Sequence, residues 1–396
     1  MSLGKLSLKL RVGHSVWSVT LTTNWIDNQL VNMRKYKPVL LAEQIEGVAK
    51  QIKGQNFPLK HIYCFDDLSG IEKLKFRIIR KITGADYEYY VLKKTHVVLL
   101  HSHFGNKGFD DLDVARELRI PHITSFYGND VSLPQRKPDW TEKYHELFEK
   151  CDAFLVEGHH MKKCLIEMGC PQEKVIVYHL GIDLGKIPYI PRRIGSDGKV
   201  RILASGTFTE KKGLPYALEA FAFVREKHKN MEFILIGGVP DENQPVYTKT
   251  REAIYNVIEK YGLRDSVKLL GYLPYDEYIK ISQGTHIFIS PSMRAMNGDT
   301  EGGVPVSIIE MSAAGMPVLS TFHCDIPEVV INGETGYLVS ERDIEALADK
   351  LDYLVSHPEQ WGEMGIRGRQ HIQKEYNLIC QVEKLENIYT GLIEQK

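Results

Sequence analysis

The sequence lacks the features that would assign it at once to several protein classes. Its six cysteines form no Cys-x-x-Cys pair and no metal-finger spacing, which predicts buried thiols in a reducing cytosol rather than a disulfide scaffold. No apolar run reaches the roughly 18 residues of a membrane-spanning helix, and no hydrophobic signal segment stands at the amino terminus. The formal net charge of −1 gives no overall basic field, so nucleic acid is not expected as a partner. No Gly-x-Gly-x-x-Gly turn follows a strand with an acidic residue about 20 positions on, which makes an oxidoreductase the least favoured enzyme class.

The order of apolar segments predicts an α/β protein with two domains. Strand-like runs alternate with helix-like segments, as in parallel sheets. We expect strands at residues 61–64, 97–101, 122–125, 153–156, 175–178, 200–204, 231–236, 267–270, 286–290, 318–321 and 337–339. The 396 residues suffice for about two domains, and residues 186–199, rich in proline and glycine, make the best linker. The expected domains are Rossmann-like and cover residues 1–187 and 188–374.

The most informative segment is residues 299–317, D-T-E-G-G-V-P-V-S-I-I-E-M-S-A-A-G-M-P. Pro305 suits a first helical position and Gly315 a position just past the end, so a short helix is predicted with Glu310 in its middle. The helix is too apolar for a surface helix, and an unpaired buried carboxylate costs on the order of several kcal/mol. A polar group must therefore meet Glu310. It is either a ligand, which the glycines at 302–303 would let the backbone approach, or an arginine elsewhere in the chain.

A second polar loop follows the expected strand 200–204. Residues 206–213 read G-T-F-T-E-K-K-G and lead into a helix around residues 215–227. A glycine-bounded turn with lysines at a helix amino terminus can cradle an anion, and a diphosphate would fit it. The alternative is a solvated loop with exposed lysines.

Two motifs stand at strand ends in the first half. Residues 124–130 read T-S-F-Y-G-N-D, and His101 and His103 lie in L-H-S-H-F-G. The phenol of Tyr127 can form a hydrogen bond but cannot act as a base at neutral pH. The His-x-His pair invites a metal site, yet no third ligand is expected nearby, so a structural or acceptor-side role is preferred.

Residues 72–81 combine basic and apolar side chains. Lys73, Lys75, Arg77, Arg80 and Lys81 alternate with Leu74, Phe76, Ile78 and Ile79. A basic amphipathic helix can lie on an anionic bilayer. The preferred interpretation is a domain helix with a solvated basic face, because the run is short for an interfacial anchor.

Together these segments resemble retaining glycosyltransferases of the GT-B fold, in the family 4 group (glycosyl transferases group 1) that includes colanic-acid and exopolysaccharide biosynthesis enzymes. Glu310 and the following M-S-A-A-G-M-P-V match the end of the family pattern E-G-x-x-x-P-x-x-x-E-A-x-A-x-G-x-P-V, and I-P-E-V-V continues it from Ile326. Eight residues separate Glu301 from Glu310 where the family has seven, which we interpret as a one-residue insertion. The family's loop G-R-x-x-x-x-K-G is matched except that Thr207 replaces the arginine, and Tyr127 replaces a usual histidine.

The resemblance implies roles for named residues. Residues expected to act in catalysis are Lys212, Glu301 and Tyr127. Residues expected to bind the donor are Gly206, Thr207, Lys212, Gly213, Gly271, Tyr272, Gly302, Gly303, Val304 and Glu310. Lys212 would contact the diphosphate, Glu310 the ribose, and Glu301 with the backbone of 302–304 the donor sugar. Candidates for the acceptor side or the cleft are His101, His103, Asp130 and Arg294; Arg294 and Lys211 are also candidates to replace the missing arginine.

The expected fold is α/β of the GT-B type, with two Rossmann-like domains, a cleft between them and a carboxyl-terminal helix, about residues 375–396, that crosses back to the first domain. The expected activity is sugar transfer from a nucleoside-diphosphate sugar to a saccharide or lipid-linked acceptor, with retention, without a metal or other cofactor, and in polysaccharide or glycoconjugate synthesis. The expected location is the cytoplasm, with peripheral contact to the inner face of a membrane as an option. The alternatives are a nucleotide-sugar-binding protein without catalysis and a GT-B epimerase or phosphorylase.

Overall fold

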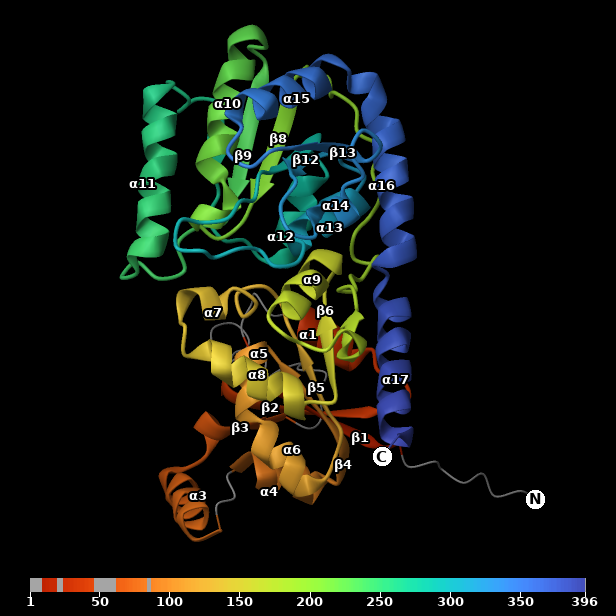
Figure 1. Cartoon of the computed structure of the whole chain (residues 1–396). Coiled ribbons are helices and arrows are strands. Elements are labelled where there is room, and N and C mark those ends of the chain that lie inside the picture. The colour runs from red at the N-terminus through yellow and green to blue at the C-terminus, as the bar shows by residue number, and fades with distance from the viewer. Residues whose placement is uncertain (1–8, 20–23, 46–61, 84–86, 396) are drawn as a thin grey trace, which may run out of the picture. The chain divides into compact units, whose positions relative to one another are not determined.

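The computed structural model describes residues 9–19, 24–45, 62–83 and 87–395 (Figure 1). By its internal contacts the chain divides into a first unit, residues 1–181 with 378–396, and a second unit, residues 182–377. Residues 182–187 group with the second unit because Ile182 and Ile187 are buried in its core. The segment expected as a linker is packed there too, since the buried guanidinium of Arg192 donates to the carbonyl oxygens of Ser282, Thr285 and Ala314.

The described part of the first unit forms a seven-stranded parallel sheet in the order β3-β2-β1-β4-β5-β6-β7. The strands are β1 (Arg11–Val19), β2 (Lys37–Ile45), β3 (Ile62–Cys64), β4 (Val97–His103), β5 (His122–Ser125), β6 (Ala153–Val156) and β7 (Val175–Val177). The helices are α1 (Asn24–Val31), α3 (Gly70–Thr83), α4 (Tyr87–Thr95), α5 (Gly105–Asp110), α6 (Leu112–Leu118), α7 (Leu133–Arg136), α8 (Trp140–Lys150), α9 (His159–Glu167) and α17 (Leu378–Glu394).

Strands β1 and β2 are absent from the strands expected from sequence. The chain R-V-G-H-S-V-W-S-V of β1 mixes polar residues into a central strand, so it shows neither a continuous apolar run nor a clean alternation. Its polar residues His14 and Ser15 are nevertheless buried. In β2 a proline stands at the second position, which reads as a strand breaker although it is tolerated at a strand's start.

The second unit, all of whose residues are described, contains a six-stranded parallel sheet in the order β10-β9-β8-β11-β12-β13. The strands are β8 (Val200–Ser205), β9 (Met231–Ile236), β10 (Val267–Leu269), β11 (Ile287–Ser290), β12 (Val318–Thr321) and β13 (Gly336–Val339). The helices are α10 (Leu214–Lys227), α11 (Pro245–Lys260), α12 (Tyr275–Ser282), α13 (Val306–Ala313), α14 (Ile326–Val329), α15 (Ile344–Ser356) and α16 (Trp361–Glu375).

Both faces of the second sheet are covered, which explains why its strands read as continuous apolar runs. Along β8, Ile202 and Ala204 belong to the core that includes residues of α10 and α15, whereas Leu203 belongs to the core that includes residues of α12 and α13. In each sheet the strand order reverses once, between β1 and β4 and between β8 and β11. Ligands of doubly wound sheets bind outside the carboxyl ends of the strands at such a reversal.

The carboxyl-terminal helix α17 returns to the first unit, as expected from sequence. The buried Glu386 on α17 accepts hydrogen bonds from the backbone N–H groups of Arg34, Lys35 and Tyr36 at 2.8, 2.6 and 3.1 Å. Tyr389, one turn later, is hydrogen-bonded through its hydroxyl to Nδ1 of His101 on β4 at 2.6 Å. Among the described residues no helix is long and apolar enough to cross a bilayer.

Candidate active site

Two polar loops meet at the strand-order reversal of the second sheet. The loop after β8 ends in a short 3₁₀ turn (Glu210–Lys212), and the longer loop after β11 carries Glu301. Nζ of Lys212 lies 2.8 Å from Oε1 and 2.9 Å from Oε2 of Glu301. The two side chains singled out from separate motifs therefore form one ion pair at the position where this fold binds ligands.

The carboxylate of Glu301 is held from several sides. Its side chain is 6% exposed, and Ser292 donates a hydrogen bond to Oε1 at 3.0 Å. The backbone N–H of Glu301 donates to Nε2 of His323 at 3.2 Å, and Nδ1 of His323 lies 2.6 Å from Glu341. Burial alone would raise the pKa of Glu301, but the positive charges of Lys212 and Lys211 hold that pKa below its usual value. Glu301 is thus a fixed anion at neutral pH, which keeps Lys212 in place.

Glycines allow these loops to approach one another. The alkyl chain of Lys212 passes over Gly206, where a Cβ atom would lie 3.4 Å from Cδ of the lysine. Gly213 has a φ of +62°, and a Cβ there would lie 2.0 Å from the carbonyl oxygen of Pro291. A side chain at Gly213 would separate the loop after β8 from the loop after β11. In the second loop, Gly302 also has a positive φ, of +73°.

Glu310 lies in the buried helix α13, as the spacing predicts, but the helix begins one residue later than expected. Pro305 is its amino-terminal cap with extended backbone, not its first helical residue. The polar group that meets Glu310 is a phenol, because Tyr275 lies close enough to lower the pKa of its carboxyl group. Burial raises the pKa of Glu310 to about 7, and the Tyr275 hydrogen bond offsets only part of that shift. Within the described residues no arginine forms an ion pair with Glu310, which leaves its charge open to a ligand.

The neighbouring donor-site candidates surround the same loop after β8. The hydroxyl of Tyr272 donates to Oγ1 of Thr207 at 3.2 Å and lies 3.1 Å from the carbonyl oxygen of Gly238. The carbonyl oxygen of Gly271 accepts from Gly237 at 2.8 Å, which ties the end of β10 to the end of β9. Thr207 in the arginine position thus closes a contact with Tyr272 and supplies no positive charge.

Of the two candidates for the missing charge, Lys211 is the better placed. Its Nζ lies 3.2 Å from Asp299 and donates to the carbonyl oxygen of Thr300 at 3.0 Å. It therefore lies beside Glu301, whose pKa it lowers. Arg294 is exposed, and its backbone N–H donates to Glu341 at 2.8 Å.

In the first unit, the His-x-His motif has a third histidine beside it, so the expectation that no third ligand lies nearby was wrong. His14 on β1, His101 and His103 on β4 are buried, and one nitrogen of each lies within 4.8 Å of the others. Sequence reasoning missed His14 because β1 itself was not predicted.

These histidines form hydrogen-bonded chains. Nε2 of His103 lies 3.1 Å from Nδ1 of His14, and Nδ1 of His103 lies 2.6 Å from the Tyr127 hydroxyl. His101 contacts Tyr389 and, at 2.7 Å, Ser125. Burial lowers the pKa of all three histidines and raises that of Tyr127, so the groups are neutral at physiological pH. A metal ion would displace several of these hydrogen bonds, so the cluster fits a neutral network better.

Asp130 shapes the loop after β5. Its Oδ1 accepts from the backbone N–H groups of Tyr127, Gly128 and Val131 at 3.0, 2.9 and 3.2 Å, and its Oδ2 accepts from that of Gly105 at 2.8 Å. The carboxylate is buried. Through these hydrogen bonds Asp130 fixes the backbone conformation of the loop that carries Tyr127.

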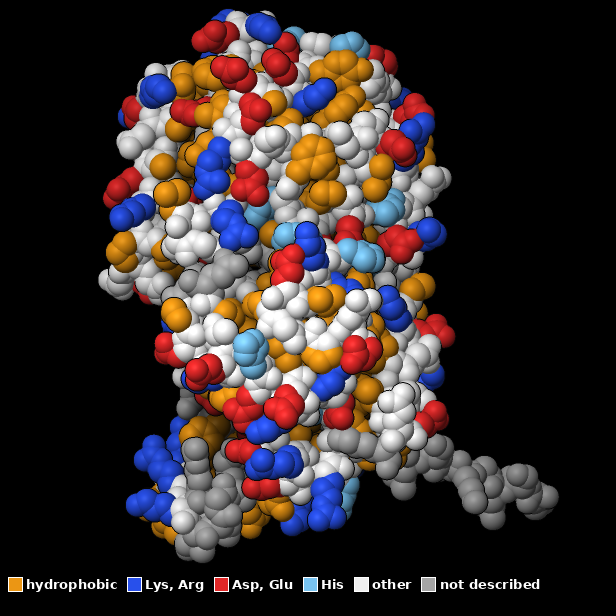
Figure 2. Space-filling view, in the orientation of Figure 1, with side chains coloured by type: hydrophobic (Ala, Val, Ile, Leu, Met, Phe, Trp, Pro, Cys, Tyr) orange, Lys and Arg blue, Asp and Glu red, His pale blue; other side chains and the backbone are white. Residues whose placement is uncertain are grey.

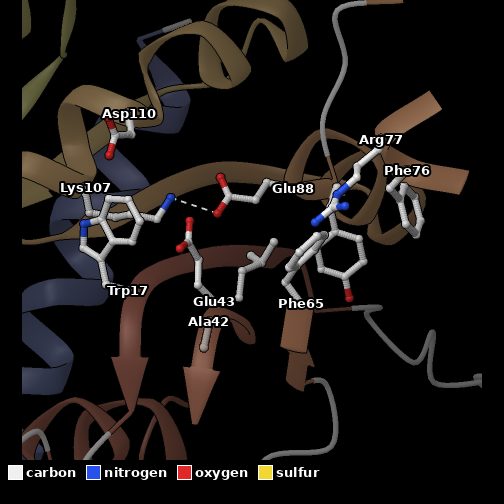
Figure 3. Close-up of a pocket in the computed structure, with 11 residues that line it drawn as sticks. Trp17, Ala42, Glu43, Phe65, Phe76, Arg77, Glu88, Lys107 and Asp110 are labelled. Carbon is white, nitrogen blue, oxygen red and sulfur yellow. Dashed lines mark hydrogen bonds and ion pairs between the residues drawn. The ribbon is translucent and has the colours of Figure 1, made fainter. Parts of the chain in front are cut away.

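A pocket of about 550 Å³ lies at the carboxyl ends of β1, β2 and β3 in the first unit (Figure 3). Trp17, Phe65 and Tyr87 contribute aromatic walls, and Glu43, Glu88 and Asp110 contribute carboxyl groups. No residue of this pocket was among the site residues expected from sequence.

A buried charge cluster closes one side of that pocket. Lys107 is 2% exposed, and its Nζ lies 2.8 Å from Glu88 and 2.5 Å from Asp111. Burial and the neighbouring Asp111 carboxylate raise the pKa of Glu88 to about 8, despite Lys107. Glu88 is therefore largely protonated at pH 7 and can both donate and accept a hydrogen bond. The Lys107–Asp111 spacing of four residues was a signal that sequence reasoning could have used.

Comparison with known protein families gives matches over most of the chain. The family described as "Glycosyl transferases group 1" matches residues 189–371, and "Glycosyltransferase Family 4" matches residues 74–186. The amylovoran biosynthesis glycosyltransferase AmsK of Erwinia amylovora is 31% identical over 292 residues, which cover 73% of this chain and 69% of AmsK. The putative colanic acid biosynthesis glycosyltransferase WcaL of Escherichia coli is 31% identical over 281 residues, which cover 70% of this chain and 66% of WcaL. The matched regions thus span about two thirds of these relatives.

Solved structures match the fold over nearly the whole chain. Anabaena HepE in complex with UDP-glucose has a TM-score of 0.76 at 14% identity and covers 96% of this chain and 100% of its own. A sucrose-phosphate synthase from Thermosynechococcus elongatus has a TM-score of 0.74 at 16% identity, with 98% and 100% covered. At these identities the likeness concerns the fold alone, and it agrees with the expected GT-B class.

Proposed function

From the premise that this chain belongs to the glycosyl transferases group 1, in glycosyltransferase family 4, we propose that it transfers a sugar from a nucleoside-diphosphate sugar to an acceptor hydroxyl, with retention at the anomeric carbon. The observation that carries the proposal is the Lys212–Glu301 ion pair at the strand-order reversal of the second sheet. It places a cation and a fixed anion on two loops whose backbone can approach a ligand.

The residues around this pair have complementary roles in donor binding. Lys212, with Lys211 beside it, neutralises the charge that grows on the leaving diphosphate, which stabilises the transition state electrostatically. Glu310 accepts hydrogen bonds from the ribose hydroxyls, in exchange for the contact with Tyr275 that it has in the free protein. Glu301 and the backbone of 302–304 hold the donor sugar, while Gly206, Thr207, Gly213, Gly271 and Tyr272 shape the nucleotide side.

The transfer step needs no nucleophile from the protein. The acceptor oxygen bonds to the anomeric carbon on the face from which the diphosphate leaves, the bond from that carbon to the phosphate oxygen breaks, and a diphosphate oxygen takes the acceptor proton. The first unit supports this route, because Tyr127 keeps its proton and His103 is buried and neutral. The network of Tyr127, His103 and His14 then positions the loop after β5 instead of accepting a proton.

The names of the relatives support a proposal for the biological substrate class. AmsK and WcaL are named for amylovoran and colanic acid biosynthesis, so we assign this chain to exopolysaccharide or glycoconjugate assembly on the cytoplasmic side of the membrane, with a saccharide or lipid-linked acceptor. HepE is described in complex with UDP-glucose, which makes UDP-sugars the first donors to try. The protein's own residues supply the charge that the diphosphate requires, so we expect activity without an added metal ion.

The test is a thermal-shift panel with UDP, GDP, ADP and dTDP and their common sugar conjugates. A ligand that binds only the folded state stabilises it by about 2.7 kcal/mol at a hundred times its dissociation constant. One nucleotide should shift the melting temperature of the native protein and of the control Lys227→Ala, whose side chain is exposed on α10, but not that of Lys212→Ala or Glu310→Ala.

With the donor known, NMR of the product should show the anomeric configuration of the donor, with and without EDTA. Inversion would refute the proposed transfer route, and loss of activity in EDTA would refute metal independence. Donor binding without transfer to any acceptor would favour a non-catalytic binding protein, for which Thr207 in the arginine position is the motivating observation. Turnover of the donor alone would indicate an epimerase.

A further inference from the structure

Helix α3 presents an apolar stripe to solvent. Ile71 is 83% exposed, Leu74 57% and Ile78 49%. Residues spaced by three and four along a helix share one face, so these side chains form a continuous strip over about two turns. Together with Lys75 they also line a shallow surface depression. Single exposed aliphatic side chains are common on protein surfaces, but several that lie together in one patch usually mark an interaction site.

The flanks of this stripe are basic. Lys75 and Lys81 are exposed beside it, as is Arg77 on the same helix. The segment 72–81 contains five basic residues and one acidic residue in a chain whose net charge is −1. Figure 2 shows Lys and Arg side chains gathering over α3 at the lower left. The side chains of Ile79 and Arg80 lie outside the described part of the structure. An apolar strip bordered by cations is complementary to the surface of an anionic bilayer, with aliphatic groups at the acyl boundary and cations at the head groups.

The same helix forms a wall of the first-unit pocket. Phe76 packs edge-on against Tyr87, with ring centroids 5.0 Å apart, and both line the pocket together with Arg77 (Figure 3). The rest of the pocket offers what a saccharide requires: aromatic walls that can stack on the C–H face of a sugar, and carboxyl groups that accept from its hydroxyls. The cationic group Lys107 is already neutralised by Asp111 and donates a hydrogen bond to Glu88.

We infer that α3 seats the protein on an anionic membrane and that the adjoining pocket receives the saccharide head of a lipid-linked acceptor. The inference rests on the proposed function for the identity of the pocket's ligand, whereas the membrane contact rests on α3 alone. The outward face of α3 thus contacts the lipid surface, and its inward face lines the pocket. A solvated basic face, the interpretation preferred from sequence, accounts for the lysines but not for the exposed Ile71, Leu74 and Ile78.

The membrane contact is tested by sedimentation of the full chain with vesicles of phosphatidylcholine alone or mixed with phosphatidylglycerol. The native protein should bind the mixed vesicles, more weakly as salt rises, and not the neutral ones. Ile71→Ser/Leu74→Ser/Ile78→Ser should abolish binding. Lys75→Gln/Lys81→Gln should weaken it about 30-fold, from the usual contribution of two basic residues at an anionic surface. The matched control Arg116→Gln/Lys163→Gln removes two exposed cations from α6 and α9 of the same unit and should bind like the native protein.

Equal vesicle binding by the native protein and the triple variant would overturn the membrane contact, as would no binding by either. Sedimentation equilibrium without lipid tests whether a second copy of the chain covers the apolar stripe instead. A dimer of the native protein that the triple variant dissociates would show that a second copy covers the stripe and would overturn the inference.

The acceptor class is tested with radiolabelled nucleotide sugar and mixed vesicles that contain a bacterial membrane lipid extract. Label should enter the organic phase with the native protein and at least 10-fold less with the triple variant. Label only in water-soluble products would overturn the lipid-linked acceptor. The thermal shift with nucleotide depends on the second unit and should be unchanged in the triple variant. Failure of that shift in the native protein as well would count against the proposed function, while the vesicle result would still decide the membrane contact.

Discussion

The buried carboxyl group of Glu310 leads to a prediction with a definite sign and pH window. Replacement by glutamine keeps the shape of the side chain and an oxygen that can accept from Tyr275, but removes the charge that burial opposes. We therefore expect Glu310→Gln to stabilise the ligand-free second unit at alkaline pH while it weakens nucleotide binding. Binding sites often contain residues that lower the stability of the free protein but contribute to ligand binding.

The magnitude follows from the shifted pKa. In the unfolded chain the group titrates near 4.5, and in the folded protein burial raises its pKa to about 7. At 1.36 kcal/mol per unit this difference disfavours the folded state by about 3 kcal/mol above pH 7. Because the folded pKa is the higher one, the full stability is present below pH 4.5 and is lost as pH rises through 7. The advantage of Glu310→Gln should thus be small at pH 5 and near its full value at pH 8.

Hydrogen exchange followed by mass spectrometry can measure this effect in each unit separately. About 3 kcal/mol corresponds to roughly a hundredfold slower opening, since each 1.4 kcal/mol is a factor of ten. Peptides from β11 and β12 should show that protection in Glu310→Gln at pH 8, whereas peptides from β5 and β6 in the first unit should not change. The exposed control Glu345→Gln on α15 should leave both sets unchanged. Equal protection at pH 5 and pH 8, or faster exchange at pH 8, would refute the assignment of the buried charge.

Three further predictions concern other parts of the chain. Lys212→Met should lower kcat/KM for transfer by about 100- to 1,000-fold, the usual effect of removing one group that stabilises transition-state charge. Steady-state kinetics with the identified donor would measure this loss, and a loss below tenfold would contradict the prediction. Tyr127→Phe removes the hydroxyl that lies 2.6 Å from His103. This change should alter kcat only a few-fold and leave its pH profile unchanged, because burial keeps the pKa of Tyr127 above its usual range. Loss of an alkaline limb from the pH profile would show that the phenol acts as a base. Glu386→Ala removes the acceptor of three backbone N–H groups, of which only that of Tyr36 lies in a buried residue, and should destabilise the first unit by about 2 kcal/mol, within the roughly 1 to 3 kcal/mol of one buried unsatisfied group. Exchange in peptides from α17 and β4 would report that loss, and unchanged exchange there would contradict it.

Much of the second unit could be predicted from the sequence because its information is local. Strands β9, β11 and β12 are buried on both faces and read as largely apolar runs, and β9 and β12 fall at the predicted residues. The segment around Glu310 also predicts a polar contact by itself, because a carboxylate in an apolar helix requires a polar partner wherever the helix lies. That requirement and the family resemblance predict Glu310, Glu301 and Lys212 as site residues from the sequence alone.

The partners of those residues could not be predicted in the same way. Tyr275 reaches Glu310 because α12 and α13 pack on the same face of the sheet, and His323 reaches the backbone of Glu301 from the end of β12. Nothing in the sequence around either residue sets these distances. The polar strand β1 was missed for a related reason, because His14 is tolerated in a central strand only where it shares a hydrogen bond with His103 on β4.

The sequence by itself determined which segments form helices and strands in the second unit, where the charged loops lie, and to which family the chain is similar, because side-chain pattern and turn chemistry act over a few residues. The tertiary structure alone decided that Lys212 pairs with Glu301, that Glu310 meets a phenol and no arginine, and that α3 turns Phe76 inward and Ile71 outward. These are contacts between residues distant along the chain, and their energies depend on burial and on neighbours that only the packed sheets bring together.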